Sequence, residues 1–114
     1  MEIATVATFF SGVSFLFFGS SCLLAAYMRD EFIRYGLDRQ RPLVGVLQLL
    51  GGVGLLLGYW ISPLLAAVAA GGLCLLMVGG VGVRIKIGDS AIATAPALLY
   101  AVLNGYLALH YAAL

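Results

Sequence analysis

The formally charged side chains of this 114-residue chain are confined to its second residue and to two short segments, residues 29–41 and 84–89. The long stretches outside these segments carry no formal charge, and 63% of all residues are hydrophobic. An apolar helix needs about 20 residues to cross the roughly 30 Å hydrocarbon core of a bilayer. The uncharged stretches therefore have room for four crossings, and they leave too few residues for a soluble domain.

Helix-start signals divide the apolar sequence into four spans. Pro42 suits the first turn of a helix, where its missing N–H loses no hydrogen bond. Ser62 followed by Pro63 repeats this signal with a serine cap, so the second and third helices are expected to form a tight hairpin. Asp89 or Ser90 can cap the fourth helix. We predict one transmembrane domain over residues 1–114, with spans at about 3–28, 42–60, 63–83 and 91–112.

The polar segment that follows the first span, residues 29–41, has an apolar side despite its mixed charges. We expect a short interfacial helix there that ends near Gly36, with Asp30 and Arg34 paired one helical turn apart. The predicted fold class is therefore an all-α membrane protein, a four-helix up-down-up-down bundle with a short interfacial helix after the first span.

All six Lys and Arg residues lie in the two polar segments, which four crossings place on the same side of the membrane. The positive-inside rule assigns that side to the cytoplasm. Tyr59, Trp60, Tyr106 and Tyr111 fall at the opposite boundary, where interfacial aromatic side chains are common. We predict a multi-pass protein of the cytoplasmic (inner) membrane, with both termini on the non-cytoplasmic side.

Small residues follow the helices at spacings that favour close packing. Gly54 and Gly58 form a GxxxG pair, and GxxxG surfaces let helix backbones approach each other in a bilayer. Similar small faces occur on the third and fourth spans; their members are Ala66, Ala67, Ala70, Gly71, Ala97, Ala101, Gly105, Ala108 and Ala112. We expect these faces to pack the bundle, and they leave homo-oligomerisation open.

Two amides lie inside the apolar spans, Gln48 in the second and Asn104 in the fourth. An amide facing lipid would be left without hydrogen bonds, so both should face inward. Tyr100 and Tyr111 share a helical face with Asn104. Two interpretations remain: hydrogen bonds between helices, or a polar lining for a quinone-like or lipid-like molecule. The candidate ligand-binding residues are Gln48, Tyr100, Asn104 and Tyr111.

The hydroxyl side chains of the first span, such as Thr8, Ser11 and Ser14, are less informative because they can bond to their own helix. Four basic residues could instead hold an anionic lipid headgroup or a membrane protein partner. They are Arg34, Arg41, Arg84 and Lys86.

Cofactor signals are weak in this chain. Cys22 and Cys74 lie in separate apolar segments without metal-ligand spacing, so no metal site is predicted. The glycine-rich residues 79–82 lack the strand that precedes a nucleotide-binding loop. The divided distribution of basic charge also argues against a nucleic-acid partner. The expected partners are the lipid bilayer and a hydrophobic small molecule such as a quinone or lipid.

Several short stretches and the overall length resemble the DoxX-like family of small four-helix membrane proteins. The stretches are residues 31–37, Gly45, residues 48–52 and residues 75–77. What the resemblance implies about function is mixed. Some relatives are subunits of thiosulfate:quinone oxidoreductase or accompany membrane redox complexes, while distant animal relatives assist receptor assembly. Family members often carry an acidic residue where this chain has Gln48, which argues against a proton-linked role at that position.

Three functions are compatible with these observations. The first is an accessory or ligand-binding membrane protein that holds a quinone-like or lipid-like molecule or serves a membrane redox complex. The second is an assembly factor or chaperone that acts without a ligand. The third, a small dimeric transporter, is weakened because the first span has no buried acidic residue for coupling. An autonomous enzyme is disfavoured because no cofactor motif, thiol pair or carboxylate pair occurs.

Overall fold

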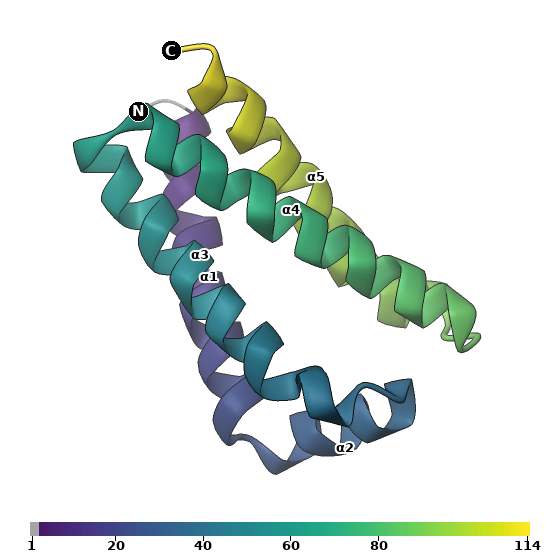
Figure 1. Cartoon of the computed structure of the whole chain (residues 1–114). Helices are drawn as coiled ribbons and strands as arrows, with labels where there is room; N and C mark the ends of the chain where they lie inside the picture. Colours follow the sequence, from purple (N-terminus) through teal and green to yellow (C-terminus); the bar gives the residue numbers. More distant parts are fainter. Residues whose placement is uncertain (1–2) are drawn as a thin grey trace.

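The computed structural model describes residues 3–114, except for the side chain of Asp38. The chain forms α1 (Ile3–Leu24), α2 (Ala26–Tyr35), one 3-10 turn (Asp38–Gln40), α3 (Arg41–Ile61), α4 (Pro63–Lys86) and α5 (Ala91–Ala112) (Figure 1). Residues 3–114 contain no β-strand, and α1, α3, α4 and α5 are long and apolar enough to cross a membrane. The predicted all-α membrane class, with a short helix after the first long one, is therefore confirmed.

The helix ends follow the capping signals of the sequence. Ser62 caps α4, since its Oγ accepts a hydrogen bond from the backbone N–H of Leu65 at 3.4 Å. Ser90, rather than Asp89, caps α5 and accepts from the N–H of Ala93 at 3.1 Å. Gly36 ends α2 with a φ of 77°, a left-handed conformation that glycine adopts without steric cost.

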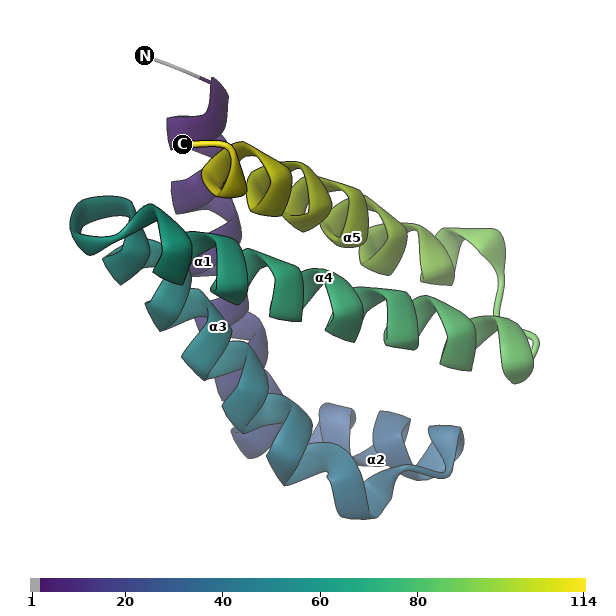
Figure 2. The same ribbon diagram turned by 45° about the horizontal axis from the view of Figure 1, so that its top comes forward.

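The first long helix ends earlier than the sequence predicted. We expected apolar helix to continue to about residue 28, whereas α1 stops at Leu24. The break lies at Ala25, whose φ of −82° and ψ of 131° are extended and cannot continue a helix. The chain turns there, and α2 runs out to the side of the bundle instead of extending α1 (Figure 2).

Glycines bring α1 and α3 into backbone contact along most of their length. A Cβ atom on Gly19 would lie 2.8 Å from the carbonyl oxygen of Gly45, and one on Gly52 would lie 2.9 Å from the carbonyl oxygen of Gly12. Close approach of backbones is how helices gain packing energy in a bilayer. The sequence analysis identified the small face of α3 but missed its glycine partners on α1.

Helices α3 and α4 touch mainly near the hairpin that joins them. There a Cβ atom on Gly58 would lie 2.8 Å from the Cβ of Ala66, and one on Gly54 would lie 3.2 Å from the Cβ of Ala69. The predicted GxxxG pair is therefore a packing surface. Away from the hairpin, the α1–α3 pair and the α4–α5 pair separate toward α2 (Figure 2).

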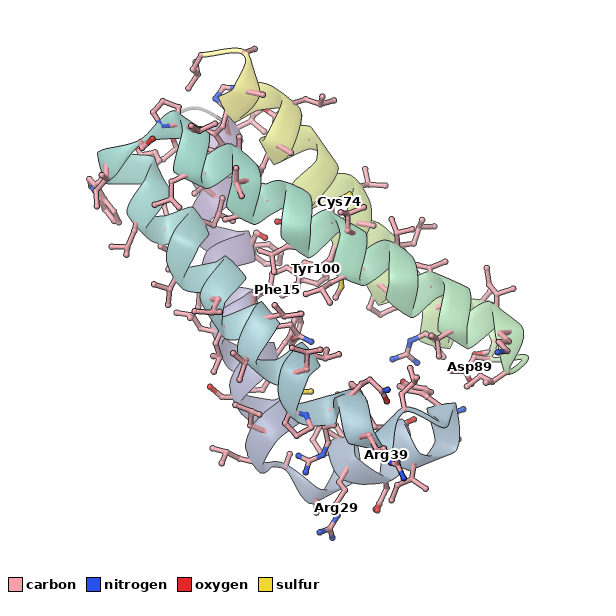
Figure 3. The ribbon with its side chains drawn as sticks, in the orientation of Figure 1. Phe15, Arg29, Arg39, Cys74, Asp89 and Tyr100 are labelled. Atoms are coloured by element: carbon pink, nitrogen blue, oxygen red, sulfur yellow. The ribbon has the colours of Figure 1, made fainter. Side chains whose placement is uncertain are left out.

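The outward surfaces of the helices carry large apolar side chains (Figure 3). Exposed examples come from all four long helices: Leu24, Trp60, Leu64, Leu75, Ile92 and Leu109. The fully buried positions include Phe15, Leu55 and Leu107, which lie where the helix pairs meet. An apolar exterior around a small core is typical of a protein surrounded by lipid, so these helices contact the bilayer.

Candidate ligand-binding cavity

A cavity of about 1030 Å³ lies between the two helix pairs, and residues of all five helices line it. Its lining residues come mainly from α3 and α4, with others from α2. In Figure 2, α2 lies at the end where α3 and α4 are farthest apart. Pockets that bind small molecules typically measure roughly 300–1,000 Å³. This cavity is therefore large enough for a ligand with a long apolar part.

Most of the cavity wall is apolar. Apolar lining residues from α1 to α4 include Phe18, Phe32, Val44, Leu47, Leu50, Val68, Leu75, Leu76, Met77 and Val83. Four of them, on the outer edges of α3 and α4, are also exposed at the surface: Leu47, Leu50, Val68 and Leu75. The cavity thus opens sideways between α3 and α4, where lipid chains surround the helices, and a membrane-soluble molecule could reach it from the bilayer.

Gln48 is the buried amide in this apolar wall. Its side chain is only 6% exposed, and its Oε1 atom has no hydrogen-bond partner among the described residues. Buried polar groups are nearly always hydrogen-bonded, because an unsatisfied one costs about 1–3 kcal/mol. A ligand that donates a hydrogen bond to Gln48 would remove this cost.

At the α2 end, an ion-pair cluster joins α2 to the loop between α4 and α5. Arg34 donates to Asp89 Oδ1 at 2.8 Å through Nη1 and to Glu31 Oε2 at 2.9 Å through Nε. Arg84 donates to Asp89 Oδ2 at 3.2 Å. The predicted pairing of Arg34 with Asp30 is wrong: Arg34 binds Glu31 on its own helix and Asp89 across the molecule.

These contacts shift the ionisation of two members of the cluster. The hydrogen bond from Arg34 holds the pKa of the Asp89 carboxyl below its ordinary value, and the nearby charges of Arg34 and Arg84 act in the same direction. Hydrogen bonds to Asp89 and Glu31 raise the pKa of Arg34. The ion pairs also place the two polar segments at the same end of the molecule, as four crossings require.

Tyr35 lies beside this cluster and lines the cavity. Its hydroxyl is buried without a hydrogen-bond partner among the described residues. The guanidinium groups of Arg34 and Arg84 lie 5.2 Å and 5.4 Å from the centroid of its ring. Burial raises the pKa of Tyr35, partly opposed by the positive charge of Arg84, so the hydroxyl stays protonated and can donate a hydrogen bond.

Two of the four predicted ligand-binding residues lie between helices instead of in the cavity wall. Asn104 accepts a hydrogen bond from Ser11 Oγ at 2.7 Å and donates from Nδ2 to its own helix at 2.8 Å. The hydroxyl of Tyr111 lies 2.6 Å from that of Thr8. These contacts join α5 to α1, so the structural interpretation applies to Asn104 and Tyr111.

Tyr100 belongs to both regions. Its hydroxyl donates to Ser14 Oγ on α1 at 2.9 Å, while the residue lines the cavity beside Gln48. Its ring packs edge-on against Phe15 and Phe18, with centroids 5.4 Å and 5.2 Å away. Figure 3 shows Phe15 beside Tyr100. The structure therefore brings Gln48 and Tyr100 to one cavity and separates both from Tyr111.

The hydroxyl groups of α1 are more important than the sequence analysis assumed. Thr8 does bond to its own helix, at 2.7 Å from the carbonyl oxygen of Ala4, but Thr8, Ser11 and Ser14 all reach side chains of α5. Thr8, Ser11 and Ser14 recur every third residue and so share one helical face. That spacing, set against the polar face of α5, was the signal that could have revealed the contact.

The four basic candidates have different surroundings. Arg34 and Arg84 bind Asp89, whereas Arg41 Nη1 donates to the backbone carbonyl of Cys22 at 2.8 Å and so caps the end of α1. Lys86 is exposed and lies outside the cavity lining. Arg84 is therefore the one of these four that faces the cavity.

Comparison with known proteins gives one match. A model of the DoxX-like family matches residues 2–106. Searches of curated proteins and of solved structures gave no match. The family match extends over nearly the whole chain, including α1 to α4 and most of α5. The chain belongs to the DoxX-like family.

Proposed function

We propose that this membrane protein binds a hydrophobic molecule, quinone-like or lipid-like, in the cavity between α3 and α4. One observation carries the proposal: the amide oxygen of Gln48 is buried in an apolar wall without a hydrogen-bond partner among the described residues. An amide oxygen without a donor is costly in the bare protein, and a ligand hydroxyl, such as that of a reduced quinone or of a lipid, would remove the cost by donating a hydrogen bond to it. Gln48 and Tyr100 are the residues we assign to the binding site.

The shape of the cavity supports the same proposal. Its apolar wall and sideways opening suit a molecule that is dissolved in the bilayer, while Tyr35 and Arg84 make one end polar. An amphiphile has this distribution of polar and apolar surface. A water-soluble substrate would gain little from such a wall, because most of its polar groups would lose their hydrogen bonds.

We further propose that the protein holds its ligand for a partner complex, such as a membrane redox complex, instead of converting it. The Gln48 amide does not titrate near neutral pH, so it can orient a ligand but cannot transfer protons as a carboxyl group would. We also propose that the α2 end faces the cytoplasm and that both termini lie on the other side of the inner membrane, because the basic residues around α2 follow the positive-inside rule.

The test is native mass spectrometry of the protein purified in mild detergent, followed by solvent extraction of any bound molecule. We expect a reproducible hydrophobic adduct on the wild-type protein. The Gln48→Leu variant should lose roughly 90% of it, because a buried hydrogen bond is worth about 1–1.5 kcal/mol. Ser20→Ala is the control, since Ser20 bonds to its own helix outside the cavity.

Two results would overturn the proposal. Wild-type protein that carries no hydrophobic molecule, and takes up neither quinone nor lipid when these are added, has no ligand site. A partner protein that co-purifies stably with such empty protein would instead support the assembly-factor alternative. Equal retention by Gln48→Leu and Ser20→Ala would remove Gln48 from the site.

A further inference from the structure

The cavity has a positively charged side chain at one end only. Arg84, in the last turn of α4, is the one formally charged side chain among the described residues that line it. Its side chain is 27% exposed, so it is partly removed from solvent. A single positive charge at one end of an apolar cavity favours a ligand with a negative charge at one end.

Arg84 also has hydrogen-bonding capacity to spare. A guanidinium group has five N–H donors, and among the described residues only Nη1 of Arg84 is engaged, with Asp89 at 3.2 Å. Asp89 is shared with Arg34, which holds it more closely at 2.8 Å. Glu31 also binds Arg34, so these four side chains together carry no net formal charge. What Arg84 offers a ligand is its remaining N–H donors, on a guanidinium group that lines the cavity.

The hydroxyl of Tyr35 supplies a second donor at the same end. It is buried without a partner among the described residues, and its ring centroid lies 5.4 Å from the Arg84 guanidinium. Because the pKa of Tyr35 is raised by burial, this hydroxyl keeps its proton at neutral pH. Two elements far apart in sequence, α2 and α4, thus bring donors together beside the cavity.

The remainder of the cavity is suited to the apolar part of an amphiphile. Its wall beyond Arg84 is formed by side chains such as Leu47, Leu76 and Met77. Gln48 lies about 10 Å along α3 from the first residue of that helix, by the usual rise per residue. It could therefore bond to a hydroxyl or another donor on the ligand below the head.

We propose that the cavity selects an amphiphile with an anionic head, a carboxylate or a phosphate, which Arg84 and Tyr35 hold while an apolar chain lies against α3 and α4. This inference rests on the proposed function and narrows its ligand class. A neutral quinone would use the same apolar wall. An anion gains more from the donors at the head end, because charge-assisted hydrogen bonds are roughly twice as strong as neutral ones.

The surrounding charges favour the same class of ligand. All six Lys and Arg residues belong to the two polar segments that meet at the α2 end. A basic residue near a membrane surface attracts anionic lipids. This attraction raises the local concentration of acidic amphiphiles where the head end of the cavity lies.

The experiment measures binding to the full-length protein in nanodiscs of zwitterionic lipid, with four probes: oleate, oleoyl lysophosphatidate, oleyl alcohol and decylubiquinone. Oleate and oleyl alcohol share one chain and differ in head charge. We expect the anionic probes to bind at least about tenfold more tightly than oleyl alcohol. Preference between oleate and lysophosphatidate tells which anionic head is favoured.

Variants test which residues cause the preference for an anionic head. Arg84→Gln should weaken oleate binding about tenfold or more and leave oleyl alcohol nearly unchanged, and Tyr35→Phe should weaken it about threefold. Tyr35→Phe removes only a hydroxyl, so it keeps the ring that packs beside Arg84. The control is Arg39→Gln, which removes one positive charge from the same end at an exposed residue outside the cavity lining.

The outcomes separate the two proposals. If decylubiquinone or oleyl alcohol binds as tightly as oleate, the cavity binds hydrophobic molecules but the anionic head is wrong. An equal loss of oleate affinity in Arg84→Gln and Arg39→Gln would also overturn the proposal of an anionic head, because general surface charge would then explain the preference. If none of the four probes binds, the proposed function fails as well.

Discussion

The α1–α5 contact and the α3–α4 cavity contain the same kinds of polar side chain in opposite states. Between α1 and α5, the amide of Asn104 is hydrogen-bonded through both its oxygen and its nitrogen. In the cavity, Gln48 has an amide oxygen without a partner among the described residues. Both amides are buried, at 0% and 6% exposure, so burial alone does not distinguish them.

This difference separates a structural amide from a binding one. Both interpretations were open for both amides in the sequence, since an intramembrane amide signals only that it must face inward. The hydrogen-bond partners decide between them. A satisfied amide joins helices, whereas an unsatisfied one beside a cavity is available to a ligand.

The largest effect on stability is expected at the close contact between α1 and α3. In Gly19→Ala, the added Cβ would lie 2.8 Å from the carbonyl oxygen of Gly45, which is backbone and cannot swing aside. Helices α1 and α3 would have to separate, at an expected cost of about 2–4 kcal/mol. Unfolding in a denaturing detergent series measures this loss.

The matched control is Gly71→Ala on α4. A Cβ there would meet no atom within 4 Å, so we expect a change within about 1 kcal/mol. Equal destabilisation by the two variants would mean that glycine flexibility, and not helix contact, explains Gly19.

An intermediate effect is expected from exchanging the two amides for leucine. Asn104→Leu leaves the Ser11 hydroxyl without its partner, so it should destabilise the bundle by about 1–2 kcal/mol. Gln48→Leu removes an unsatisfied group, so the empty protein should be as stable as wild type or slightly more stable. Thermal unfolding of ligand-free protein compares them, and greater instability of Gln48→Leu would contradict the distinction between the two regions.

The sequence predicted the architecture well because its strongest signals are local. Ser62 with Pro63, Ser90 and Gly36 each act within a few residues, so helix ends can be derived without tertiary structure. The break at Ala25 was missed because alanine is a good helix former and nothing nearby in sequence stops the helix. The end of α1 is instead held by a contact across the chain, in which Arg41 binds the carbonyl oxygen of Cys22.

The candidate site was predictable only in part, for a related reason. Apolar surroundings and helical position nominated Gln48 and Asn104 equally, because their surroundings in sequence are alike. Whether each amide finds a hydrogen-bond partner depends on which helix faces it, and the separation of the two helix pairs decides that. Tyr35 was not nominated as a ligand residue because its burial depends on how α2 folds back toward α4.

The smallest effect concerns the ion-pair cluster that joins α2 to the other helix pair. The pKa of Asp89 is lowered in the folded protein from its ordinary value of 3.8. Asp89 therefore stabilises the cluster at neutral pH, and this contribution is lost as the pH falls through the lowered pKa. Between pH 7 and about 5, Asp89 stays ionised, so hydrogen exchange in α2 should not change once the intrinsic exchange rates are corrected.

Below about pH 4, residues 26–35 should exchange faster in the wild-type protein as Asp89 takes up a proton and releases Arg34. Asp89→Asn removes that titration, so its α2 should exchange faster already at pH 7 and change less on acidification. If wild type and Asp89→Asn exchange alike at neutral pH, Asp89 does not hold α2, and the helix must be kept against the cavity by its apolar contacts.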